Sequence, residues 1–190
     1  MAKRISLREF QMRLVDRLTS AVRGETSRAL LGVQAGKDYW LLNLSDAGEV
    51  VPVPTVMPVP LTKPWFAGVV NIRGMLYSVV DFSAFQGGEP TVLNSDARLL
   101  LVGVKHGINS ALLVSKTLGL RSPETLEARA ATESTPSVYP WVGETLHDTQ
   151  AQVQAQTQTQ RSFMSVSALT WRQLNIKPLL SYPGFLDVSR

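Results

Sequence analysis

Apolar positions recur at two spacings along the chain and divide it into a helical start and a strand-rich body. In the start, residues three or four positions apart line one face of a helix over residues 5–22, namely Leu7, Phe10, Leu14 and Leu18. Ser6 and Glu9 fit a capping box before this pattern, and Gly24 ends it. We predict an amphipathic helix within residues 1–27. It packs either on its own domain, which is the commoner case, or on a partner.

From residue 29 onward, short apolar runs alternate with turn residues, and this pattern predicts β-hairpins. The predicted strand pairs are 29–34 with 39–44, the two halves of 65–81, and 98–104 with 110–114. The hairpin at 65–81 has a polar tip at Asn71–Gly74, where Gly74 supplies the positive φ of a tight turn.

Six further segments complete the prediction. Residues 49–60 carry four prolines and predict an edge strand or an extended surface segment. Asp81 precedes a short helical turn at 82–85 that its carboxylate caps. Residues 118–126 predict an extended connector, and 139–146 another strand. Residues 148–160 are rich in Gln and Thr, which predicts a flexible loop, and the apolar stretch 176–188 is expected to return and cover the body.

Composition and charge narrow the function classes. The 190 residues are 44% hydrophobic and 18% charged and include no cysteine, which suits a globular domain and excludes disulfides and cysteine chemistry. The chain has neither a signal-peptide apolar region nor an apolar run that spans a bilayer, so we expect it in the cytoplasm. The net charge of +4 comes from residues 1–30, which hold seven bases and three acids, while the rest is balanced.

Residues suited to catalysis are few. His106 and His147 have no partner at a metal-ligand spacing and are expected at the surface. The sequence contains no nucleophile elbow, Walker loop or paired carboxylates. We therefore expect a protein that is not an enzyme and that needs no cofactor or metal. Its four tryptophans are expected to pack in the interior, although any of them could anchor an interface.

One segment resembles a known family. The run Gly68-Val-Val-Asn71-Ile-Arg73-Gly74, followed by Val79-Val80-Asp81 and closing at Gly87, resembles the motif of CheW-like domains. The resemblance extends over about residues 28–175. The leading helix and the closing PGFLDV resemble the PilI subgroup, whose members are adaptors of chemosensory systems that govern type IV pili.

The resemblance implies a mainly β fold of two five-stranded SH3-like barrels around a shared core. The expected organisation is an N-terminal helix at 1–27, a CheW-like domain at 28–180 and a tail at 181–190. Within the domain, the first barrel is expected at about 30–90 and the second at about 95–175. The initial Met and the closing tail favour one such domain over a fragment of a larger kinase.

The resemblance also implies a non-catalytic adaptor for twitching motility signalling, recruited to membrane-associated receptor arrays. Its partners would be the regulatory domain of a CheA-like histidine kinase and the cytoplasmic tip of a methyl-accepting chemoreceptor, with no nucleic acid and no membrane insertion. Arg73, Glu49 and Asn71 are the candidate receptor- or kinase-binding residues. Gly68, Gly74 and Asp81 are expected to be structural, and Asn71 also shapes the turn.

A different class of function stays open on the residues alone. The basic first 30 residues also suit a small β-barrel protein that binds nucleic acid through this segment. Such binding would weaken steeply with salt, whereas an adaptor would co-purify with a kinase.

Overall fold

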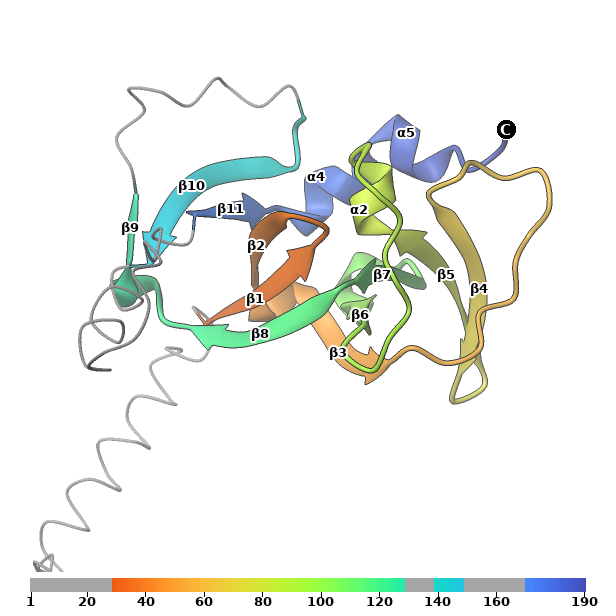
Figure 1. The fold of residues 1–190 in the computed structure, drawn as a ribbon, viewed down its shortest axis with the longest axis horizontal. Helices are drawn as coiled ribbons and strands as arrows, with labels where there is room; N and C mark the ends of the chain where they lie inside the picture. The colour runs from red at the N-terminus through yellow and green to blue at the C-terminus, as the bar shows by residue number, and fades with distance from the viewer. Residues whose placement is uncertain (1–28, 129–138, 149–169) are drawn as a thin grey trace, which may run out of the picture.

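The computed structural model describes residues 29–128, 139–148 and 170–190, which form two β-sheets with short helices between them (Figure 1). The predicted helix within 1–27, and the predicted loop at 148–160 beyond its first residue, lie outside the described residues.

The strands of the described residues form two sheets, which confirms the mainly β, two-barrel fold. One sheet has the order β8–β1–β2–β11–β10–β9, with β1 (Leu30–Ala35), β2 (Asp38–Asn43), β8 (Lys116–Arg121), β9 (Leu126–Ala128), β10 (Val142–Asp148) and β11 (Thr170–Leu174). The other has the order β3–β6–β7–β5–β4, with β3 (Ala47–Pro52), β4 (Phe66–Ile72), β5 (Met75–Asp81), β6 (Arg98–Val102) and β7 (Ser110–Val114). The six-stranded sheet exceeds the expected five strands because it includes the three-residue β9.

The division of strands between the sheets corrects the expected barrel limits of about 30–90 and 95–175. β1 and β2 lie in the six-stranded sheet with β8 to β11, and β6 and β7 lie in the five-stranded sheet with β3 to β5. The chain leaves the first sheet through η2 (Leu44–Asp46) and returns at Ser115, the single residue between β7 and β8. The Ser115 backbone N–H donates to the Gln34 carbonyl, so the return point is fixed to β1.

Parallel strand pairs explain why the chain passes from one sheet to the other and back. β5 pairs with β7 in parallel, and β11 pairs with β2 in parallel, while every other strand pair is antiparallel within the described residues. Parallel neighbours cannot be joined by a tight turn, so other elements must intervene in sequence. Each sheet thus contains segments from distant parts of the chain.

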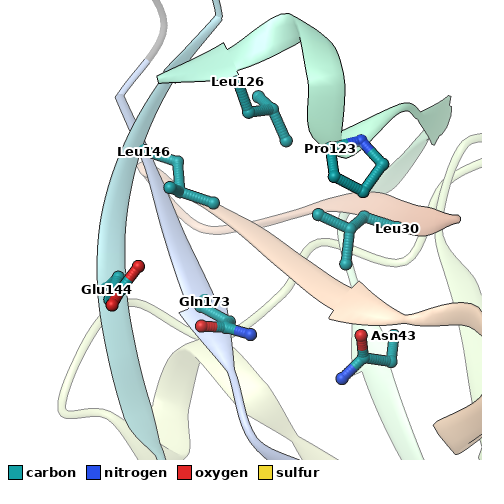
Figure 2. Close-up of a pocket in the computed structure, with 7 residues that line it drawn as sticks. All are labelled: Leu30, Asn43, Pro123, Leu126, Glu144, Leu146 and Gln173. Carbon is teal, nitrogen blue, oxygen red and sulfur yellow. The ribbon is translucent and has the colours of Figure 1, made fainter. Parts of the chain in front are cut away.

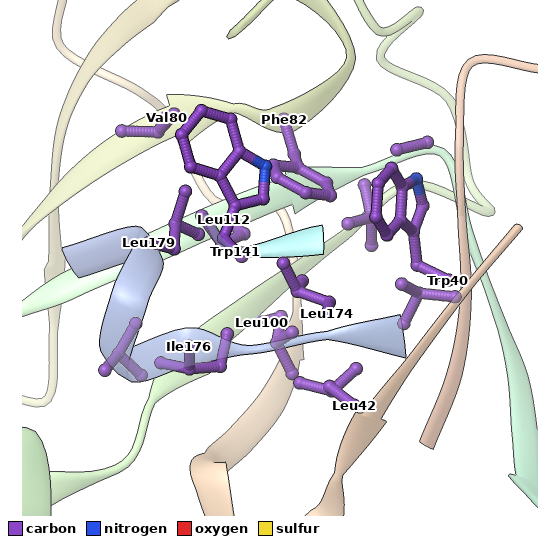
Figure 3. Close-up of a cluster of buried hydrophobic side chains, with 14 of the residues drawn as sticks. Trp40, Leu42, Val80, Phe82, Leu100, Leu112, Trp141, Leu174, Ile176 and Leu179 are labelled. Carbon is purple, nitrogen blue, oxygen red and sulfur yellow. The ribbon is translucent and has the colours of Figure 1, made fainter. Parts of the chain in front are cut away.

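The hydrophobic core lies between the two sheets (Figure 3). Alternate residues of each strand point into it, because successive side chains of a strand face opposite sides of a sheet. The six-stranded sheet contributes Leu31, Val33, Trp40 and Leu42, and the five-stranded sheet contributes Val80, Leu100, Leu112 and Val114. The intervening residues of β6 and β7 are also buried, since they fill a second cluster inside the five-stranded sheet. Burial on both faces explains why these strands read as continuous apolar runs.

Tryptophans occupy the interior, as expected. Trp40, Trp141 and Trp171 are buried, and Trp65 is half-buried against Phe85. The capped turn α2 (Phe82–Phe85) brings Phe82 edge-on to Trp40, with ring centroids 5.3 Å apart.

The C-terminal stretch returns to cover the body, as predicted, and does so with two short helices. α4 (Ile176–Ser181) and α5 (Pro183–Leu186) add Ile176, Leu179 and Phe185 to the shared core. The last residues then pair with the β3–β4 connection: Lys63 forms an ion pair with Asp187 at 2.8 Å, and the Arg190 N–H donates to the Leu61 carbonyl. Within the described residues, no helix is long and apolar enough to cross a membrane.

Candidate protein-binding surface

The β4–β5 hairpin ends in a two-residue turn at Arg73 and Gly74. Ile72 pairs with Met75, and φ is +52° at Arg73 and +84° at Gly74. Two consecutive positive φ values are typical of the type I′ turn, which suits the twist of a hairpin. The Asn71 side-chain oxygen accepts a hydrogen bond from the Gly74 N–H at 2.9 Å. Asn71 and Gly74 thus shape the turn, and Arg73 is held at the outermost point of the hairpin.

Arg73 and Glu49, two of the candidate binding residues, form an ion pair. The Arg73 Nη1 and Nη2 atoms donate to the two carboxylate oxygens of Glu49, each at 2.8 Å. The Arg73 side chain is nevertheless 76% exposed. Two of its five donors are thus taken by Glu49, and the guanidinium is oriented by a carboxylate on β3.

Exposed apolar side chains lie at the same end of the five-stranded sheet. Met75 and Leu76 follow the turn, and the register of β5 with β7 places Ile108 beside the start of β5. Val104, two residues beyond the end of β6, is 91% exposed. We call this set the tip surface, and it comprises Glu49, Arg73, Met75, Leu76, Val104 and Ile108. The four apolar members were missed from sequence, because Met75, Leu76 and Val104 lie in predicted strands whose apolar residues are expected to be buried, and Ile108 lies in the predicted turn between two strands.

A small polar cluster anchors the turn that carries Val104. Asp46 lies in η2, and η3 (Val104–His106) brings Lys105 Nζ to 2.7 Å and His106 Nε2 to 3.1 Å from its Oδ1 atom. The His106 side chain is only 10% exposed, and His147 is half-buried on β10. Both histidines were expected at the surface, and that expectation is wrong. The partner of His106 is 60 residues away in sequence, and β10 is covered by its neighbouring strands.

We expect Asp46→Asn to destabilise the fold by about 1 kcal/mol at neutral pH, the usual net worth of one such interaction. Burial would raise the pKa of the Asp46 carboxyl, but the hydrogen bond and charge of Lys105, with contributions from His106 and Asn43, lower this pKa overall. Because the pKa is lower in the folded state, ionised Asp46 stabilises the fold above its unfolded pKa of about 3.9. This stabilisation is lost as pH falls through the folded pKa.

Urea unfolding of wild type and Asp46→Asn at pH 7 and at low pH measures this difference. The gap between the two proteins should be present at pH 7 and should shrink in acid. Asp96→Asn, at an exposed aspartate, is the matched control. A stability difference between the two proteins that does not change with pH would contradict an electrostatic origin of the Asp46 contribution.

Gly68 and Asp81, two of the three predicted structural residues, lie away from the tip surface and hold parts of the five-stranded sheet together. Gly68 has a φ of +135° and lies against the backbone of Met57, which pairs with Val69 through two hydrogen bonds of 2.8 and 2.9 Å. Asp81 is buried and caps α2 by accepting from the N–H groups of Ser83 and Ala84, as predicted. Among the described residues, no group of three or more acidic or histidine side chains is placed to hold a metal ion.

The comparison with known families agrees with this geometry. Residues 29–141, more than half of the chain, match the CheW-like domain family. The chain belongs to this family.

Two individual proteins are similar to the chain. Protein PilI of Pseudomonas aeruginosa is 29% identical over 92 residues, which cover 48% of this chain and 51% of that protein. The matched region thus spans about half the length of this curated relative. Among solved structures, the scaffolding protein TtCheW from Thermoanaerobacter tengcongensis superposes with a TM-score of 0.59 over 83% of this chain and 95% of that one. At 16% identity, this second likeness concerns the fold alone.

Proposed function

We propose that the protein is a non-catalytic adaptor that couples a methyl-accepting chemoreceptor to a CheA-like histidine kinase. It would bind the cytoplasmic hairpin tip of the receptor and the regulatory domain of the kinase, and so link their two equilibria. Family membership supports the adaptor class. The similarity to PilI supports a chemosensory system that controls type IV pili and twitching motility. The site of action would be the cytoplasm, at membrane-associated receptor arrays.

The observation that carries the proposal is the composition of the tip surface. It joins an exposed, oriented arginine to four exposed apolar side chains at one end of a rigid sheet. Arginine and large apolar residues dominate the binding energy of protein interfaces, and such residues grouped on a surface mark a binding site. A receptor hairpin made of helices offers apolar ridges and carboxylates that match both parts of this surface.

The Arg73–Glu49 pair suits a contact that must form and break. An exposed ion pair contributes about 0–1 kcal/mol to stability, so its loss costs the fold little. Glu49 holds the guanidinium in place before binding and limits the entropy that Arg73 would lose on contact with a partner. Donors that Glu49 does not use are available to a receptor carboxylate or carbonyl.

We expect Arg73→Ala to weaken binding of the receptor cytoplasmic fragment by about 10- to 100-fold, corresponding to about 1–3 kcal/mol for a charged hydrogen bond at an interface. Arg73→Lys keeps the charge but loses the bidentate geometry, so it should fall between wild type and Arg73→Ala. Isothermal titration calorimetry with the purified fragment measures each affinity.

The matched control is Lys63→Ala, which removes the base of another exposed ion pair at the opposite end of β4. It should leave receptor affinity unchanged. Receptor affinity that is equally unchanged in Arg73→Ala, with a normal circular dichroism spectrum, would reject the assignment of Arg73.

The nucleic-acid alternative rests on the basic first 30 residues, and a separate experiment tests it. A gel shift of the full chain with DNA or RNA at two salt concentrations should show no specific complex if the adaptor role is correct. A specific complex that weakens steeply with salt would favour the alternative.

A further inference from the structure

A pocket at one end of the six-stranded sheet is not used by the proposed adaptor surface. Its volume is about 300 Å³, and it opens between β10 and β11 on one side and β1 and β2 on the other (Figure 2). Leu30, Leu126, Leu146 and Pro123, which lies in η4 (Pro123–Thr125), form its apolar wall. Asn43, Glu144 and Gln173 form its polar part.

The pocket opens onto the smallest of the three hydrophobic clusters. Only Leu30, Leu41 and Trp171 are buried there, while Leu126 and Leu146 pack against them half-buried. Buried side chains in well-packed cores contact neighbours on all sides, and among the described residues these two have none on the pocket side. An apolar side chain that enters the pocket would extend this cluster and cover both leucines.

The N-terminal segment joins the described domain at this pocket. Leu30 lines the pocket and is the first residue of β1, so residues 1–28 lead directly to its opening. Seven residues, 23–29, lie between position 22, the end of the predicted helix, and Leu30, which makes eight Cα–Cα steps. At about 3.3–3.6 Å per residue they span at most about 29 Å, enough for the preceding residues to turn back over the opening.

The charged residues near the pocket also favour the N-terminal segment as its occupant. Glu144 is the charged residue that lines the pocket, it is exposed, and it has no ion-pair partner among the described residues. Glu124, also exposed, lies next to Pro123 in η4. The N-terminal segment carries seven bases and three acids. The carboxylate of Glu144 in the pocket wall, with Glu124 near Pro123, complements a basic amphipathic helix.

We propose that residues 5–22 fold back onto their own domain and that their apolar face, with Phe10 or Leu14 inserted, occupies this pocket. The sequence leaves open whether this segment packs on its own domain or on a partner, and the proposal selects packing on its own domain. It does not rest on the adaptor function, because the pocket and the tip surface belong to different sheets.

Disulfide trapping in the full chain tests the docking directly, because the protein has no cysteine of its own. The test pairs are Phe10→Cys with Gln173→Cys and Leu14→Cys with Gln173→Cys. The matched control is Met12→Cys with Gln173→Cys. Two residues from both Phe10 and Leu14, position 12 lies on the opposite face of the helix. We expect at least one test pair to form a disulfide within one chain several-fold faster than the control.

Equal rates for the test and control pairs would overturn the proposal. So would disulfides found only between two chains, because the occupant would then be the N-terminal segment of a second copy. A second measurement avoids cysteines: Leu14→Glu should lower the melting temperature more than Met12→Glu, which makes the same chemical change on the opposite face. Equal melting temperatures would count against docking.

Discussion

Replacing Gly68 with alanine should destabilise the protein by about 3 kcal/mol or more, through backbone strain and loss of hydrogen bonds. At φ = +135° an L-residue is strained, and a Cβ atom at this position would lie 2.1 Å from the Met57 carbonyl oxygen. That oxygen accepts the Val69 N–H, so the clash would separate the two strand segments. The Met57–Val69 bridge joins the β3–β4 connection to β4, and its loss would open one side of the five-stranded sheet.

Gly74→Ala is the matched control for this prediction. Gly74 also has a positive φ, but nothing lies within 4 Å of an added Cβ. Its replacement should cost only about 1 kcal/mol, the usual penalty of the left-handed conformation. Urea unfolding followed by circular dichroism compares the two variants. If Gly68→Ala were no less stable than Gly74→Ala, the close approach of Met57 would not be what requires glycine at position 68.

Local features of the fold were predictable from the sequence because they depend on neighbouring residues. The hairpin at 65–81, the capping role of Asp81 and the return of the C-terminal stretch all follow from turn chemistry and apolar runs. The strand β8 was missed, since Gly119 and the exposed Leu120 interrupt the pattern and residues 118–126 indicated only a connector. The helices α4 and α5 were also missed, because two prolines lie within an apolar segment too short to show helical periodicity.

Distant pairings could not be predicted from these patterns. The expected order of two consecutive barrels came from the family resemblance, whereas β6 and β7 join the sheet of β3–β5. These two strands are apolar on both faces, so their pattern does not indicate which sheet they join. The candidate site shows the same limit. Arg73 and Glu49 were each selected by resemblance, but their ion pair, and the exposure of Val104 at the same end of the sheet, depend on the strand register.

Replacing Asp81 with alanine should cost about 3 kcal/mol, because its carboxylate holds together a segment of eleven residues with charged hydrogen bonds. Besides capping α2, Asp81 accepts from the Thr91 N–H at 2.6 Å and from the Thr91 hydroxyl at 2.8 Å. The side chain is buried, so its removal leaves donors without partners and without access to water. The loss would spread to the shared core, since α2 places Phe82 against Trp40.

Asparagine at position 81 separates the contributions of the two carboxylate oxygens. Oδ1 accepts from Ser83, Ala84 and the Thr91 hydroxyl, while Oδ2 accepts only the Thr91 N–H. Asp81→Asn can keep the first three bonds but sets an amide donor against the Thr91 N–H, so its stability should fall between wild type and Asp81→Ala. Asp96→Ala, at an exposed aspartate of the same connection, should be neutral. Unfolding free energies from urea titration test this order, and an Asp81→Ala variant as stable as Asp96→Ala would show that the carboxylate does not hold the segment.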